Sequence, residues 1–102
     1  LTQSMREMVQ LLAESTMHIK DTLPFIRVHK LEKVAPARVQ VVAMEKRGDA
    51  IYQNEMASLF RNPQVDAKEL LRQQTVLEAL EAALNSCQDA VDVLENVAIK
   101  HA

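Results

Sequence analysis

The strongest helical pattern in the sequence lies at residues 66–100, which read DAKELLRQQTVLEALEAALNSCQDAVDVLENVAIK. Mostly apolar residues recur in it at alternating steps of three and four, namely Leu77, Leu80, Leu84, Cys87, Val91, Leu94 and Ala98. A period of about 3.5 residues is typical of the buried seam in a left-handed helix bundle. Asp66 can cap the start of this helix, and Glu69 three residues later completes a pattern close to a capping box. The sequence therefore predicts one long helix that reaches Lys100.

Two further helices are predicted before it. The first runs from about Thr2 to Asp21, and its apolar face is expected to hold Met5, Val9, Leu12, Thr16, Ile19 and Leu23. Pro24 removes a backbone donor and disfavours helix at the residue before it, which predicts a turn or a kink there. Residues 25–33 are expected to form a connection.

The second helix is expected to start near Pro36, because proline is well tolerated in a first turn. It should run to about Phe60, where Asn62 and Pro63 end it. Three long helices with short connections predict an all-α fold, an antiparallel three-helix bundle.

The composition narrows the class of protein. The 102 residues contain one Gly and one Cys, with a formal net charge of −2. One Gly argues against a glycine-rich phosphate loop, and one Cys excludes an internal disulfide framework and fits a reducing compartment. The charge balance gives no electrostatic reason to expect nucleic-acid binding. No apolar stretch approaches the roughly 20 residues that a membrane-spanning helix needs. We expect residues 1–102 to form a single cytoplasmic domain.

The second helix carries two carboxylates on a row that is otherwise suited to a core. The row consists of Val42, Glu45, Asp49, Tyr52, Met56 and Leu59. Burying an unpaired ion costs several kcal/mol, so Glu45 and Asp49 call for a metal ion or a basic side chain from a neighbouring helix. Gly48 between them predicts close approach of another backbone, because a mid-helix glycine costs about 1 kcal/mol relative to alanine.

A more ordinary interpretation stays open for the same residues. A second row lies one residue further along, at Ala43, Lys46, Ala50, Gln53, Ala57 and Phe60. If the helix turns slightly toward that row, Glu45 and Asp49 sit at the edge of the core and pair with Arg38 or Lys46 in water.

The third helix has a polar row beside its apolar seam. Glu81, Asn85 and Asp89 follow one another at steps of four residues, so they should project from one side of the helix. Helical bundles build metal sites from carboxylates of two adjacent helices. A row of acidic residues is, however, more often a solvated face. The candidate metal ligands are thus Glu45, Asp49, Glu81, Asn85 and Asp89. No nucleophile or oxyanion-binding loop is apparent, so we expect no catalytic residues and no enzyme activity.

Two segments resemble the PhoU-like family. Residues 44–52, MEKRGDAIY, followed by Leu59 and Phe60, are similar to that family's E-x-x-G/A-D-x-I-Y … L-F helix. Residues 80–100 resemble its C-terminal helix, with the pattern L-E-x-A-x-D-x-C-E-D-V-A-x-V-L-E. The resemblance covers roughly residues 36–100 and is nearest to the phosphate transport regulators that accompany Pit-type phosphate transporters.

The resemblance implies a six-helix fold made of two related three-helix bundles, of which this chain is the C-terminal half. It also implies clusters of iron, zinc or manganese held by E/D-x-x-x-D motifs of adjacent helices. Glu45 and Asp49 match the first motif, and Asp89 matches the second. Asn85 stands where the family usually has Asp, and Gln88 stands where it usually has Glu. This half therefore offers less negative charge to a cation than the family pattern does.

The function expected from this resemblance is that of a non-enzymatic regulator or accessory protein of inorganic phosphate transport. It would dock a helical face on a Pit-type membrane transporter or a signalling protein, which places it at the inner membrane through that partner. Two alternatives stay open: a metal-binding or storage protein, and a plain oligomerisation bundle. Uncovered apolar area on an isolated half-fold also predicts a homo-oligomer.

Overall fold

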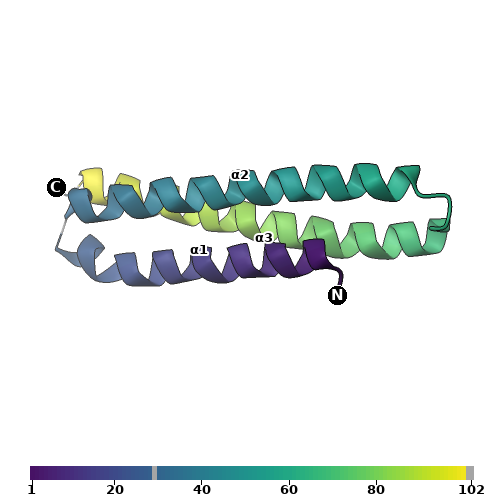
Figure 1. The fold of residues 1–102 in the computed structure, drawn as a ribbon. Helices are drawn as coiled ribbons and strands as arrows, with labels where there is room; N and C mark the ends of the chain where they lie inside the picture. The colour runs from purple at the N-terminus through teal and green to yellow at the C-terminus, as the bar shows by residue number, and fades with distance from the viewer. Residues whose placement is uncertain (29, 101–102) are drawn as a thin grey trace.

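The computed structural model describes residues 1–28 and 30–100, and within them it contains three helices (Figure 1). These are α1 (Gln3–Arg27), α2 (Leu31–Arg61) and α3 (Ala67–Lys100). They form a bundle of 55 × 18 × 16 Å in which every helix packs against the other two. As the chain turns back twice, α1 and α3 run in the same direction and α2 runs against both (Figure 1). The predicted antiparallel three-helix bundle is confirmed.

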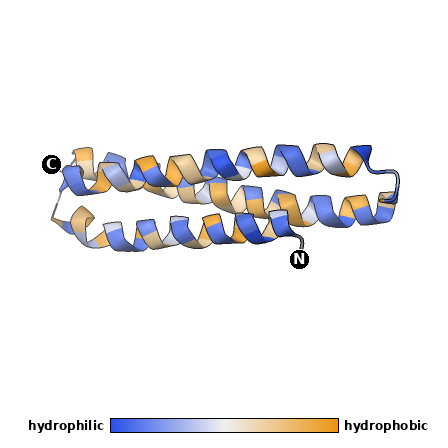
Figure 2. Cartoon of the chain, in the orientation of Figure 1, coloured by the Kyte–Doolittle hydropathy of each residue, from blue (hydrophilic) through white to orange (hydrophobic). Residues whose placement is uncertain are grey.

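The apolar seam predicted for α3 forms the centre of the bundle. Leu77, Leu84, Cys87, Val91 and Ala98 are buried, and Leu80 and Leu94 are half-buried. Around Leu77 and Leu84 lies a core cluster that also contains Met5, Met8, Leu11, Met56 and Leu59. A second cluster, with Val41, Cys87 and Val91, lies further along the bundle. Because each helix alternates hydrophobic and hydrophilic stretches, all three are amphipathic (Figure 2).

The predicted cap of α3 is confirmed in part. The side-chain Oδ1 of Asp66 accepts a hydrogen bond of 2.8 Å from the backbone N–H of Glu69. The Glu69 carboxylate, however, accepts hydrogen bonds from Arg72 and Gln73. The Glu69 side chain therefore stabilises the first turn of the helix through these two bonds, and not through the bond to the backbone N–H of Asp66 that a capping box would have.

The helix bounds near Pro24 and Pro36 differ from the predicted ones. The predicted turn near Pro24 was wrong, because α1 continues through Pro24 to Arg27. The second helix begins at Leu31, so Pro36 lies in its second turn and not in its first. Each proline costs the helix one N–H donor, but both side chains are exposed, so water can reach the carbonyl that loses its partner.

The predicted apolar row of α1 is confirmed in part, since Leu12 and Ile19 are half-buried against the core clusters. Met5 is buried as expected, but Val9, Thr16 and Leu23 are exposed, and the residues before them, Met8, Ser15 and Thr22, are buried. Burial of the two hydroxyls is possible because each has a partner. Thr22 donates to the carbonyl of His18 at 2.7 Å, and Ser15 donates to the Met44 sulfur at 3.4 Å. A search for apolar residues alone passes over such positions.

None of the described helices combines the length and the apolar character that crossing a membrane requires. At the α2–α3 connection the two helices extend past the beginning of α1 (Figure 1).

Candidate functional site

Carboxylates of α2 and α3 meet along the line where these two helices pack. Glu45 and Asp49 come from α2, and Glu78 and Glu81 come from α3; we call these four residues the acidic seam. Asp49 and Glu81 lie within hydrogen-bonding reach of one another, and Glu45 and Glu78 are close enough to act on the charge of Glu81. The Tyr52 hydroxyl, one turn further along α2, donates to Glu78 Oε1 at 3.4 Å. The structure thus places Glu45, Asp49 and Glu81 near one another, and their role as metal ligands stays a prediction.

At the centre of the acidic seam, the Glu81 carboxyl resists ionisation because Asp49 lies beside it. The hydrogen bond with Asp49, together with burial and the charges of Asp49, Glu45 and Glu78, raises the pKa of Glu81 from 4.5 to about 7. A carboxyl that must hold its proton to bond a second carboxylate resists ionisation, as in other close carboxylate pairs. Burial, and then the charges of Glu78 and Glu81, raise the pKa of Tyr52. The phenol therefore stays protonated and continues to donate its hydrogen bond.

The basic partner expected for Glu45 and Asp49 lies elsewhere. Arg38 is on the same side of α2, but its Nε bonds Asp92 Oδ1 at 2.8 Å and lies 3.5 Å from Glu95 Oε1. The prediction that Arg38 or Lys46 pairs with Glu45 or Asp49 was wrong, because Arg38 reaches across to Asp92 and Glu95 of α3, and the ion pairs of the described residues include none with Lys46. The expected position at the edge of the core is correct, since Glu45 and Asp49 are half-buried.

Gly48 faces the core directly beside the acidic seam. A Cβ built on it would overlap the Cδ1 atom of Leu84, a side chain that is 1% exposed. The close approach predicted at Gly48 is thus real, but it is made by a leucine side chain of α3 and not by another backbone. The glycine acts as a socket that holds Leu84 and brings α3 close to α2.

Among the described residues, no hydrogen bond or ion pair joins the remaining candidate ligands, Asn85 and Asp89, to the acidic seam. Asn85 and Asp89 are both exposed on α3. Each step of four residues turns a helix position by about 40°, so Asp89 has turned about 80° from the direction of Glu81. Within residues 1–28 and 30–100, no three His, Cys, Asp or Glu side chains are grouped closely enough to hold a metal ion. The part of the chain that the structure describes therefore brings carboxylates together at the acidic seam but contains no preformed cation site.

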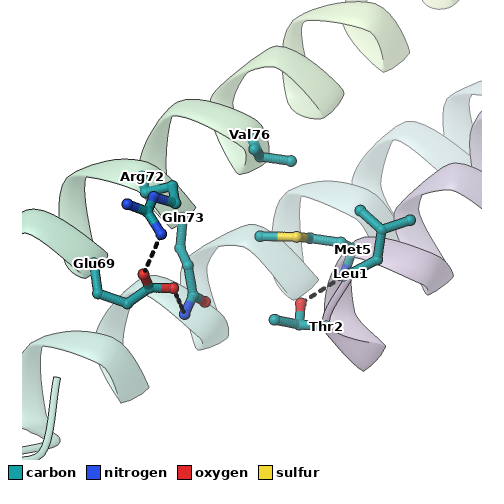
Figure 3. Close-up of a pocket in the computed structure, with 7 residues that line it drawn as sticks. All are labelled: Leu1, Thr2, Met5, Glu69, Arg72, Gln73 and Val76. Atoms are coloured by element: carbon teal, nitrogen blue, oxygen red, sulfur yellow. Dashed lines mark hydrogen bonds and ion pairs between the residues drawn. The ribbon is translucent and has the colours of Figure 1, made fainter.

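A pocket that the sequence did not indicate opens between the beginning of α1 and the first turns of α3 (Figure 3). It has a volume of about 420 Å³ and is lined by Leu1, Thr2, Met5, Glu69, Arg72, Gln73 and Val76. The Gln73 amide nitrogen donates to Glu69, whereas its buried oxygen accepts no hydrogen bond from the described residues. This pocket was not predictable, because it exists only where α3 extends past the start of α1.

Cys87 behaves as the sequence predicted, as a small core residue. It is buried in the cluster with Val41 and Val91, and this burial raises the pKa of its thiol. A thiol that is both buried and protonated is a poor nucleophile.

The comparisons with known proteins do not assign the chain to a family. No protein-family model, no curated protein and no solved structure matches it. The resemblance to PhoU-like proteins consequently stays a prediction that depends on the two quoted segments.

Proposed function

We propose that the chain is a non-enzymatic accessory protein of inorganic phosphate transport, which acts by docking a helical face on a membrane phosphate transporter of the Pit type or on a signalling protein. The main support is that the two segments resembling PhoU-like proteins, residues 44–60 and 80–100, pack against each other. Within this contact Glu45 and Asp49 of the first segment adjoin Glu81 of the second. The two segments that resemble PhoU-like proteins thus lie next to each other in the fold, and this proximity supports the proposal.

The test is made in the source cell with the full-length protein as it is expressed there. The tagged protein is expected to co-purify with a phosphate transporter, and deletion of its gene is expected to change the rate of phosphate uptake. Uptake that is unchanged after deletion, together with no transporter in the purified material, would refute the proposal.

We further propose that a divalent or ferric ion binds the acidic seam as part of this role. The supporting observation is four carboxylates along one helix contact, while Arg38, on the same side of α2, is already paired to Asp92. A cation would compete with the proton that Glu81 holds, so its binding should release protons and weaken below pH 7.

Metal content decides this second point. Native protein purified without chelator or affinity metal is analysed for iron, zinc and manganese, beside the variants Asp49→Asn and Asp89→Asn. Stoichiometric metal that is lost in Asp49→Asn and kept in Asp89→Asn is expected. Equal and negligible metal in all three samples would show that the seam holds only protons.

A further inference from the structure

Where α1 and α3 lie side by side, each helix presents an exposed row without ionisable side chains over about four turns. On α1, Val9, Thr16 and Leu23 recur every seven residues, and on α3, Ala79, Ser86 and Val93 do the same. All six are exposed, with Val9 at 43%, Leu23 at 50% and Val93 at 58%. Seven-residue spacing keeps each row on a constant side of its helix in a bundle. We call this surface the uncharged face.

The two rows of the uncharged face are level with one another. Met5 and Val76 meet in the pocket of Figure 3, which sets the alignment of the parallel helices α1 and α3. Counting along both helices from Met5 and Val76 at about 1.5 Å per residue, Val9 is level with Ala79 to within one residue, and Leu23 is level with Val93 to within one residue. The half-buried Ala83 and Ala90 lie next to these rows. Their small side chains leave room for another helix to approach closely.

Basic residues border the uncharged face along its α1 side. Arg6, Lys20 and Arg27 share one helical position, at steps of fourteen and seven residues, and all three are exposed. The ion pairs of the described residues use Arg38 and Arg72, so these three cations have no carboxylate within ion-pair distance there. A border of unpaired positive charge attracts negative side chains of a binding partner.

We propose that the uncharged face binds an amphipathic helix of a partner protein, with acidic residues along the edge of that helix which meets Arg6, Lys20 and Arg27. This inference rests on the docking role proposed above and names its surface. A second copy of the chain fits less well, because the border of the face on its α3 side offers one carboxylate, Asp89, to the three cations of the α1 side. An α-helix fits because the paired rows of α1 and α3 are the two sides of a helix-in-groove contact.

The pocket at one end of the uncharged face adds an anchor for the partner. Its walls include the apolar side chains Leu1, Met5 and Val76, and the oxygen of Gln73 lacks a donor there. A Tyr or Trp of the partner helix supplies both a large apolar ring and an O–H or N–H donor. Such aromatic anchors in pockets commonly dominate the affinity of helix contacts.

The test uses the full 102-residue chain and two synthetic helical peptides with one terminal Trp and the same apolar side. One peptide carries Glu along one edge, and the other carries Lys at the same positions. We expect the Glu peptide to bind about tenfold more tightly or better, by fluorescence anisotropy, with an affinity that falls as salt is raised. Leu23→Asp is expected to abolish binding, and Lys20→Glu combined with Arg27→Glu is expected to remove the preference for the Glu peptide.

Val39→Asp is the matched control for Leu23→Asp, because Val39 is also an exposed apolar residue but lies on α2. This variant should bind the Glu peptide as the unaltered chain does. Far-UV circular dichroism establishes that each variant is folded. Equal binding of the two peptides, or binding that survives Leu23→Asp, overturns the proposal. So does a dimer of the unaltered chain that Leu23→Asp dissociates, because a second copy would then cover the face.

The same variants separate this surface from the phosphate role. If the Glu peptide binds as expected but deletion leaves phosphate uptake unchanged and no transporter co-purifies, the phosphate role fails and the surface is supported. If a transporter co-purifies equally well with Leu23→Asp, the surface is wrong and the phosphate role stands.

Discussion

The two sides of α3 meet their neighbours in different ways. Toward α2, the helix presents Glu78, Glu81 and Asp92, and specific polar contacts tie these to named partners. On the side next to α1 it carries Ala83 and Ala90, small half-buried side chains that have no polar atom to pair with a partner. Polar pairs fix one register at the expense of stability, whereas small apolar side chains leave a surface that another helix can complete. The side toward α2 therefore serves specificity within the bundle, and the side toward α1 adjoins the surface available for partners.

The largest expected effect concerns the packing of α3 on α2. Leu84→Ala should lower the free energy of unfolding by about 3 kcal/mol, because a fully buried leucine is lost and a cavity remains. Gly48→Ala alone should cost about 1 kcal/mol, since overpacking against Leu84 outweighs the gain in helix propensity. In the Leu84→Ala background the same Gly48→Ala change should instead stabilise by about 1 kcal/mol. Urea unfolding of the four proteins measures this cycle, and strictly additive costs would contradict the socket.

The next effect is the pH dependence of the acidic seam. The pKa of Glu81 in the folded chain is about 7, above its ordinary 4.5, so the folded state binds more protons between these values. Stability should therefore fall as the pH rises from about 4.5 to about 7 and change little from this source above it. After allowance for solvent at a half-buried site, the loss is about 1–2 kcal/mol.

Glu81→Gln removes this titration and should flatten the profile of unfolding free energy between pH 5 and about 8. At the upper end of that range the variant should be more stable than the unaltered chain. Asp89→Asn, an exposed acid-to-amide change on the same helix, is the control and should keep the original slope. A slope in Glu81→Gln equal to that of the unaltered chain would show that the carboxyl pair does not titrate as proposed.

A smaller effect is expected at the ion pairs of Arg38. Arg38→Met keeps most of the side-chain volume and removes the contacts with Asp92 and Glu95, which should cost about 0.5–1 kcal/mol. The loss should shrink in 1 M salt because these side chains are partly exposed. Thermal unfolding at low and high salt provides the measurement, and a loss that salt leaves unchanged would point to packing in place of charge.

The smallest effect on stability is expected on the uncharged face. Val93→Ser should change the free energy of unfolding by no more than about 0.5 kcal/mol, because this side chain is 58% exposed. The same variant should weaken binding of the Glu peptide, which separates a surface used for partners from one used for folding. A loss of stability comparable with that of Leu84→Ala would mean that the face belongs to the core.

The number, order and direction of the helices were predictable, because the apolar period in residues 77–98 and the break at Asn62 and Pro63 are local signals. So was the meeting of Glu45, Asp49 and Glu81, which follows from carboxylates beside the seams of two helices. The exposed positions of Asn85 and Asp89 agree with the solvated face that the sequence left open as the alternative for this row. The buried Ser15 and Thr22 were missed because polarity conceals a core position until its hydrogen-bond partner is known.

The socket at Gly48 also restricts how the helices can move. Sliding α3 along α2 by one turn would drive Leu84 out of the only glycine of the chain and against side chains that bear a Cβ. A shift by a whole heptad, about 10 Å, would refill the socket but would part Arg38 from Asp92 and Tyr52 from Glu78. Piston-like transmission along this pair of helices is therefore blocked. Any signal that a bound partner imposes on the bundle must pass through it as the tilting or rotation of one stiff rod.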